Sequence, residues 1–120
     1  MICLGSNADP ERHMAEAHRR IAALYPAVRF SPTLQSPAVG IDAAPFRNAL
    51  ARFGTADGYE ETARKLKGIE AAMGATKTDK RRGIVAIDLD ILLFDGARHH
   101  ENDWSRPYIE RLLREFHTFL

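Results

Sequence analysis

Apolar residues recur along the chain with two periods, one typical of helices and one typical of strands. Three segments place apolar residues three and four positions apart, as on one face of an amphipathic helix. These predicted helices span residues 9–25, 59–73 and 106–119. Four shorter segments are apolar or alternating and are bounded by turn residues, which is typical of strands. These predicted strands span residues 1–4, 28–35, 46–53 and 84–94.

Proline and glycine indicate where these elements end. Pro26 ends the first helix, Pro32 predicts an edge position or a bulge in the second strand, and Gly74 can close the second helix. Two stretches are predicted as loops: residues 36–45, which contain two prolines and one glycine, and the polar residues 74–83.

The order of the elements predicts the fold class. Strand, helix, strand, strand, helix and strand, followed by a terminal helix, is the ferredoxin-like βαββαβ arrangement. We therefore predict an α+β protein with a mostly antiparallel four-stranded sheet, helices packed on it and a C-terminal helix. This fold hosts many unrelated activities, so it does not indicate the chemistry.

The composition is that of an ordinary globular protein. The 120 residues are 45% hydrophobic and 28% charged, and the single cysteine, Cys3, excludes an internal disulfide framework. No apolar run approaches the roughly 20 residues needed to cross a bilayer, and the start lacks the features of a secretory signal. We expect one domain over residues 1–120, in the cytoplasm, with no membrane partner.

The net charge of +1 conceals two basic segments. Residues 77–82 read K-T-D-K-R-R, with four cations and one anion, and residues 106–114 carry three arginines. Clustered cations attract anionic partners. These two segments are therefore the candidate sites for an anionic partner.

The last predicted strand carries two aspartates on one face. In residues 87–93 the odd-numbered positions are apolar, while Asp88 and Asp90 point to the other side, about 6.6–6.8 Å apart. Two such carboxylates repel each other unless a cation joins them, and Mg²⁺ is usually held by one or two carboxylates with substrate phosphates. A solvated acidic face is the alternative interpretation. The apolar Leu92 on the same face and the basic segment before the strand favour a metal site.

Several short motifs occur in an order that resembles one enzyme family. They are Leu4-Gly5-Ser6-Asn7, Ser36-Pro37-Ala38-Val39-Gly40, Phe46-Arg47-Asn48-Ala49, Ile69-Glu70 and Asp88-Leu89-Asp90-Ile91-Leu92-Leu93. Together they extend over nearly the whole chain, and the pairing of L-G-S-N with D-L-D-I-L-L is rather specific. The chain resembles the 6-hydroxymethyl-7,8-dihydropterin pyrophosphokinases of folate biosynthesis, whose fold is the βαββαβ sheet predicted above.

The resemblance implies a transferase that uses ATP as co-substrate. Its reaction would move pyrophosphate from ATP to the hydroxymethyl oxygen of a reduced pterin and release AMP. By position, Asp88 and Asp90 would hold two Mg²⁺ ions against the triphosphate. This is physically reasonable, because phosphoryl transfer is catalysed mainly by positioning and by neutralising charge.

The same resemblance suggests the pterin-binding residues. Asn48 would bind the pterin edge, since an amide in an apolar strand needs a partner. Phe46 and Phe116 would stack on the two faces of the ring, although both also match the period of a packed core. Glu70 of the Ile69-Glu70 motif is a candidate site residue with no assigned role, and a solvated helix position is the alternative. Loop residues near the pterin would be Ser36, Val39 and Gly40.

The chain departs from the family at its phosphate-binding segments. The family sequence R-W-G-P-R reads Arg81-Arg82-Gly83-Ile84-Val85 here, without the tryptophan, the proline and the second arginine. Arg106-Pro107-Tyr108 stands near the place of the family's P-H segment. Nearby cations could replace the missing arginine, with Arg81 and Arg82 as catalytic candidates. Other phosphate-binding candidates are Lys77, Lys80, Arg106 and Arg114. Arg114 falls at a family arginine position, whereas the other three are also interpretable as surface charge.

Two other functions stay open at this level. A pterin-binding paralogue without turnover is consistent with the altered R-W-G-P-R segment. A small anion- or RNA-binding module could use the basic segment, but the strands lack the aromatic motif that stacks on RNA bases, so nucleic acid is not the expected partner. The five histidines do not predict a metal site.

Overall fold

The structure is a computed structural model that describes residues 1–37 and 44–119. Its helices are α1 (Pro10–Leu24), α2 (Tyr59–Ala72), α3 (Lys77–Arg81), α4 (Pro107–Phe119) and the short 3-10 turn η1 (Glu101–Asp103). Its strands are β1 (Ile2–Ser6), β2 (Arg29–Phe30), β3 (Leu34–Ser36), β4 (Phe46–Arg52), β5 (Asp88–Ile91), β6 (Leu93–Phe94) and β7 (Ala97–Arg98). In the part of the chain that is described, no helix is long and apolar enough to cross a membrane.

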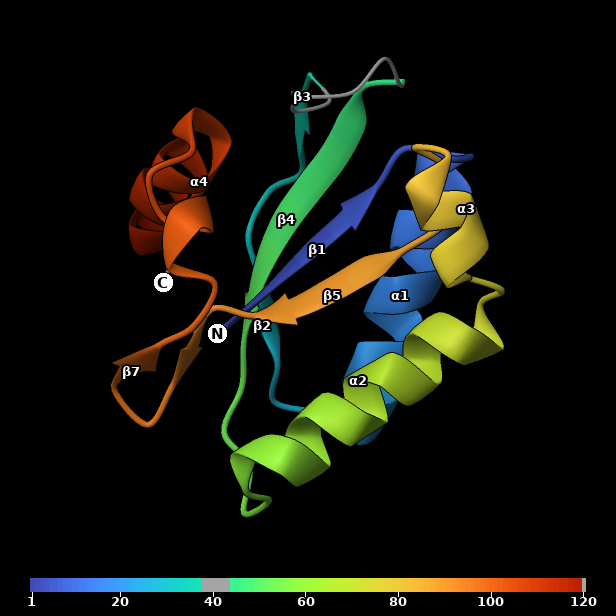
Figure 1. Ribbon diagram of the computed structural model, residues 1–120. Coiled ribbons are helices and arrows are strands. Elements are labelled where there is room, and N and C mark those ends of the chain that lie inside the picture. Colours follow the sequence, from blue (N-terminus) through green and yellow to red (C-terminus); the bar gives the residue numbers. More distant parts are fainter. Residues whose placement is uncertain (38–43, 120) are drawn as a thin grey trace.

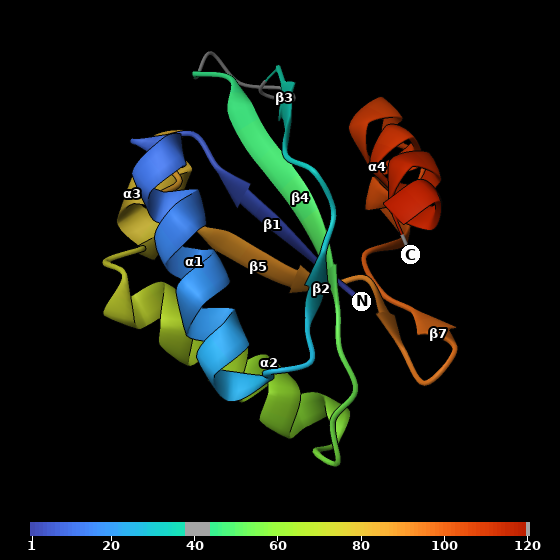
Figure 2. The ribbon, with the colours of Figure 1, turned by 180° about the vertical axis from the view of Figure 1, so that it is seen from behind.

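The strands form an antiparallel sheet between two layers of helix. Its order is β2-β4-β1-β5, with β3 also paired to β4, and α1 and α2 cover one face while α4 lies over the other (Figures 1 and 2). The main core therefore lies between the sheet and α1 and α2, where Ile21, Leu66 and Leu89 are buried. A second core, with Ile109 and Leu112, lies under α4. The predicted α+β fold is confirmed.

The second predicted strand is divided in two. Ser31 separates β2 from β3: its backbone N–H donates to Leu50 O (2.9 Å), and its hydroxyl accepts from Leu50 N–H (2.8 Å). Pro32, which has no N–H to offer a sheet, follows directly. The prediction of an edge or a bulge at this proline is confirmed, and the division gives the sheet five strands instead of four.

Two predicted boundaries near the last strand are wrong. Residues 77–81, expected in a loop, form α3, because the Thr76 hydroxyl accepts from the Asp79 N–H (3.0 Å) and caps the helix. The predicted strand 84–94 pairs with β1 only over β5. Ile91 lies opposite Ile2, where β1 begins, and beyond this pair the chain continues into the separate β6–β7 hairpin.

Candidate active site

The sheet face below α4 has a glycine between two polar residues. In the antiparallel register Gly5 of β1 lies between Asn48 of β4 and Asp88 of β5. A Cβ atom at Gly5 would come within 3.1 Å of Asn48 Oδ1 and 3.6 Å of the Phe46 ring. Because Gly5 has no side chain, a depression forms between these neighbours, and Gly5 lies at its floor.

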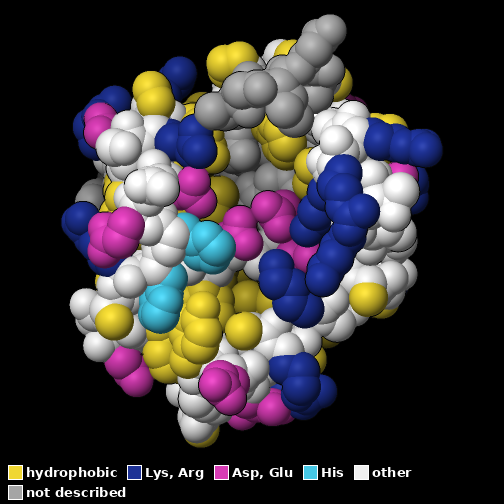
Figure 3. Space-filling model, viewed as in Figure 1, with side chains coloured by type: hydrophobic (Ala, Val, Ile, Leu, Met, Phe, Trp, Pro, Cys, Tyr) yellow, Lys and Arg dark blue, Asp and Glu magenta, His cyan; other side chains and the backbone are white. Residues whose placement is uncertain are grey.

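A cavity of about 220 Å³ lies over this floor. In Figure 3, acidic side chains gather at the hollowed centre of this face, and Lys and Arg side chains run along the side of α3. Of the predicted site residues, those that line the cavity are Ser36, Phe46, Asn48, Asp88, Asp90 and Arg106. The structure thus brings together motifs that are far apart in the sequence.

Asn48 is a buried amide with one side-chain partner in the described residues. Only 4% of Asn48 is exposed, and its Nδ2 donates to the hydroxyl of Ser36 at 2.6 Å. Its Oδ1 lies against Gly5 on the cavity floor. The amide therefore retains hydrogen-bonding capacity toward a ligand in the cavity.

Asp88 is held by a lysine from α3. The Lys80 Nζ lies 3.0 Å from Asp88 Oδ1 and 3.1 Å from Glu70 Oε1. Burial opposes the ionisation of Asp88, but the hydrogen bond and the charge of Lys80 hold its pKa below the ordinary 3.8. Partial burial also opposes the charge on Lys80, yet the pairing with Asp88 and Glu70 raises its pKa above 10.5. The pair is therefore ionised at neutral pH.

Nearby cations compensate the negative charge of Asp90 less closely than that of Asp88. Its Oδ1 lies 3.8 Å from both Lys67 Nζ and His100 Nε2, beyond hydrogen-bond distance. Burial, and then the charge of Asp88, raise the pKa of Asp90 to about 6. Two carboxylates of which one lacks a close cation form a suitable place for a divalent ion with oxygen ligands.

The sequence profile of the 7,8-dihydro-6-hydroxymethylpterin-pyrophosphokinase family matches residues 1–118. The chain belongs to this family. The resemblance inferred from the short motifs is therefore confirmed. A search of curated proteins finds no match to the chain.

The L-G-S-N motif of this family member fixes the segment before β5. Asn7 Oδ1 accepts from the Val85 N–H (2.7 Å), its backbone N–H donates to Val85 O (3.0 Å), and its Nδ2 donates to Gly83 O (2.7 Å). Val85 occupies the position where the family carries its second arginine, and it is buried. Any replacement for that arginine has to come from another element.

Phe116 lies apart from the cavity that Phe46 lines. It is 2% exposed and belongs to the core under α4 with Leu50 and Leu92. It also lines a second cavity, of about 680 Å³. The aromatic residue that shares the smaller cavity with Phe46 is Tyr108.

The remaining predicted site residues are either exposed or outside the described residues. Arg81 ends α3, Arg82 follows it, and both are exposed. Lys77 at the start of α3 and Arg114 on α4 are exposed as well. The two loop candidates that lie outside the described residues are Val39 and Gly40.

Sequence reasoning missed four residues at this site. Tyr108 and Asp103 line the cavity, and Lys67 and His100 approach Asp90. Lys67 carried a usable signal, because it precedes Glu70 by three positions on a helix and so shares its face. The positions of Tyr108, Asp103 and His100 depend on how the chain returns to β5 after the β6–β7 hairpin. The spacing of apolar residues in the local sequence does not indicate this path.

Proposed function

We propose that this chain transfers pyrophosphate from ATP to the hydroxymethyl group of 6-hydroxymethyl-7,8-dihydropterin with the help of Mg²⁺. The observation that carries the proposal is a single cavity that joins the Asn48 amide to the carboxylates of Asp88 and Asp90. In the reaction, the alcohol oxygen forms a bond to the β-phosphorus of ATP. The bond from that phosphorus to the oxygen shared with the α-phosphorus breaks, AMP leaves, and the alcohol proton is released.

The donor set matches the metal that this reaction needs. Asp88 and Asp90 offer adjacent carboxylate oxygens on one sheet face, and such hard ligands suit Mg²⁺. These two residues would hold two Mg²⁺ ions, which neutralise charge on the triphosphate when bound. Lys80 already lies at Asp88, so its cation is close to where the phosphates would come.

The pterin would occupy the cavity beside the aspartates. A volume of about 220 Å³ is below the roughly 300–1,000 Å³ of ordinary ligand pockets, so it suits one small ring system rather than a whole nucleotide. Phe46 and Tyr108 offer aromatic surface to the ring, and Asn48 offers hydrogen bonds to its edge. The triphosphate would then extend over the aspartates toward α3.

Asn48→Ala should weaken pterin binding by about 1–3 kcal/mol, the cost of leaving polar ligand atoms without a partner. Isothermal titration with the pterin alcohol measures this loss. Gln35→Ala is the matched control, since Gln35 is an exposed amide on the neighbouring strand β3 and alternates away from Ser36. ATP affinity measured without pterin should stay unchanged. Equal losses for both ligands would show that the change is structural.

Replacing Arg81 and Arg82 together by alanine should weaken ATP binding roughly tenfold, because charge-assisted hydrogen bonds to phosphate are lost. The loss should shrink at high salt, which screens exposed charges, and pterin affinity should not change. The control with the same change of charge is the double alanine variant at Arg19 and Arg20, exposed on α1. If both double variants bind ATP like the parent, Arg81 and Arg82 do not contact the triphosphate.

An assay of AMP release tests the proposed activity directly. The full chain is incubated with the pterin alcohol, ATP and Mg²⁺, and AMP and the pterin pyrophosphate are separated and quantified. We expect equal amounts of both products, and neither product without Mg²⁺. Tight pterin binding without AMP release would reject turnover and support a pterin-binding paralogue instead.

A further inference from the structure

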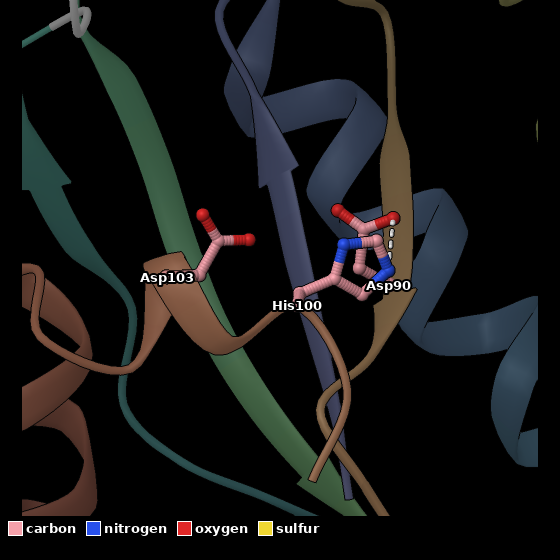
Figure 4. Close-up of side chains that lie close together, drawn as sticks. All are labelled: Asp90, His100 and Asp103. Atoms are coloured by element: carbon pink, nitrogen blue, oxygen red, sulfur yellow. Dashed lines mark ion pairs between the residues drawn. The ribbon is translucent and has the colours of Figure 1, made fainter.

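Three metal-ligating side chains converge beside the cavity, and only one of them belongs to the pair of family aspartates. They are Asp90, His100 and Asp103, and one ligand atom from each lies within 4.8 Å of the others (Figure 4). His100 Nε2 is 3.8 Å from Asp90 Oδ1. Asp90 lies on β5. His100 directly precedes the turn η1, and Asp103 is the last residue of that turn.

The turn η1 holds the histidine and the second aspartate on the same side. In a 3-10 turn, side chains three positions apart lie one above the other. The Asp103 N–H donates to His100 O at 2.8 Å, which closes this turn. His100 has a left-handed backbone (φ 53°), a conformation that histidine adopts more often than most residues with a side chain.

Contacts around the turn fix it against the sheet. The indole N–H of Trp104 donates to His99 O at 3.1 Å, and the Arg98 guanidinium lies 4.2 Å from the centre of the Trp104 ring. The His99 N–H donates to Leu92 O at 2.9 Å, which ties the segment to the end of β5. These contacts therefore hold the turn, with His100 and Asp103, next to Asp90.

Existing contacts leave ligand atoms available. Asp103 Oδ1 accepts from Arg106 Nε at 3.0 Å, and Lys67 Nζ is 3.8 Å from Asp90 Oδ1. Each carboxylate has a second oxygen besides these. The His100 side chain is 45% exposed and the Asp90 side chain 25%, so an ion can reach them.

The donor set, one imidazole and two carboxylates, differs from that of a magnesium site. Imidazole suits the later first-row metals, whereas Mg²⁺ prefers oxygen ligands and water. We propose that Asp90, His100 and Asp103 bind a divalent transition-metal ion of the Zn²⁺ type, with a fourth position open to water or to a phosphate oxygen. This site shares Asp90 with the proposed Mg²⁺ pair, but its test does not depend on the proposed function, because Zn²⁺ binding can be measured without ATP or pterin.

Calorimetric titration of the metal-free full chain with Zn²⁺, in excess Mg²⁺, tests the site. We expect one Zn²⁺ per chain. The dissociation constant for Zn²⁺ should rise at least tenfold in His100→Ala and in Asp103→Asn. Even the loss of a residue that only hydrogen-bonds to a metal ligand lowers metal affinity about 10–100-fold. His99→Ala is the matched control: this neighbouring ring stacks on Tyr59, with centroids 4.4 Å apart, and its loss should leave Zn²⁺ affinity unchanged.

Asp88→Asn separates this site from the family aspartate pair. Zn²⁺ binding should survive in this variant, and Co²⁺ should give the same visible absorption bands in it as in the parent. If Asp88→Asn loses Zn²⁺ while His100→Ala keeps it, the ion sits on the two family aspartates and the proposed site does not exist. Absence of Zn²⁺ binding by the parent, or equal weakening in His99→Ala, would also overturn it.

Discussion

Asp88→Asn and Asp90→Asn should each reduce turnover about 10³-fold or more. A metal that stabilises transition-state charge contributes several kcal/mol, and about 4 kcal/mol corresponds to this factor. Steady-state AMP release at saturating ATP, pterin and Mg²⁺ measures the loss. Asp95→Asn is the matched control, because Asp95 is exposed in the β6–β7 turn and asparagine tolerates its left-handed backbone (φ 48°) equally well. Activity retained in both site variants would reject the metal role of the aspartates.

The Asp90 variant should also be more stable than the parent in the absence of metal. Burial and the charge of Asp88 raise the pKa of Asp90 from 3.8 to about 6, so the folded chain keeps a proton that the unfolded chain has released. The free energy of unfolding of the parent therefore falls as pH rises from about 4 to 6 and stays lower above that range. Asparagine cannot ionise, so Asp90→Asn should gain roughly 1–3 kcal/mol at pH 8.

Urea unfolding with a chelator present checks this gain at several pH values. The difference between Asp90→Asn and the parent should vanish below pH 4, where the carboxyl is protonated in both states. A gain that is independent of pH would have another cause, such as packing. A stable variant without turnover also shows that the loss of activity does not come from unfolding.

The helices and strands that could be predicted from the sequence are those whose apolar residues repeat regularly because one face is buried. The helical stripe of α1 and the alternation of β5 reflect one face against the core, so Ile21 and Leu89 were placed correctly. The end of β5 was not predictable in this way, because it depends on its neighbour: β1 begins at Ile2, opposite Ile91, so the strand pairing of β5 ends there. α3 was missed because a helix of five residues has too few positions to show a period.

Of the candidate site, the alternation of side chains along a strand predicts only which residues of one strand share a face. Alternation placed Asp88 and Asp90 on one face, and the motif resemblance added Asn48. The register that sets Asn48 and Asp88 on either side of Gly5 is a property of strand pairing, which local sequence does not reveal. The position of His100 beside Asp90 likewise depends on the return of the chain after the β6–β7 hairpin.

Glu70→Ala should destabilise the fold strongly. Glu70 is 6% exposed, and its carboxylate accepts from Lys67 Nζ (2.9 Å), Lys80 Nζ (3.1 Å) and the backbone N–H of Leu89 (2.8 Å). β5 is one edge of the sheet, so among the described residues no strand pairs with this N–H, and Glu70 supplies its acceptor. Removing one member of such a buried network costs about 3–5 kcal/mol.

Urea unfolding followed by circular dichroism measures the loss, read as a lower midpoint with an unchanged slope. Glu60→Ala is the matched control, because Glu60 is an exposed glutamate on the same helix and its loss should change stability by no more than about 0.5 kcal/mol. Glu70→Gln should lie between the two, since its amide oxygen can still accept from Leu89 but its charge no longer compensates Lys67 and Lys80. If Glu70→Ala is as stable as Glu60→Ala, the carboxylate does not hold β5 in place. The two aspartates on that strand must then be positioned by pairing with β1 alone.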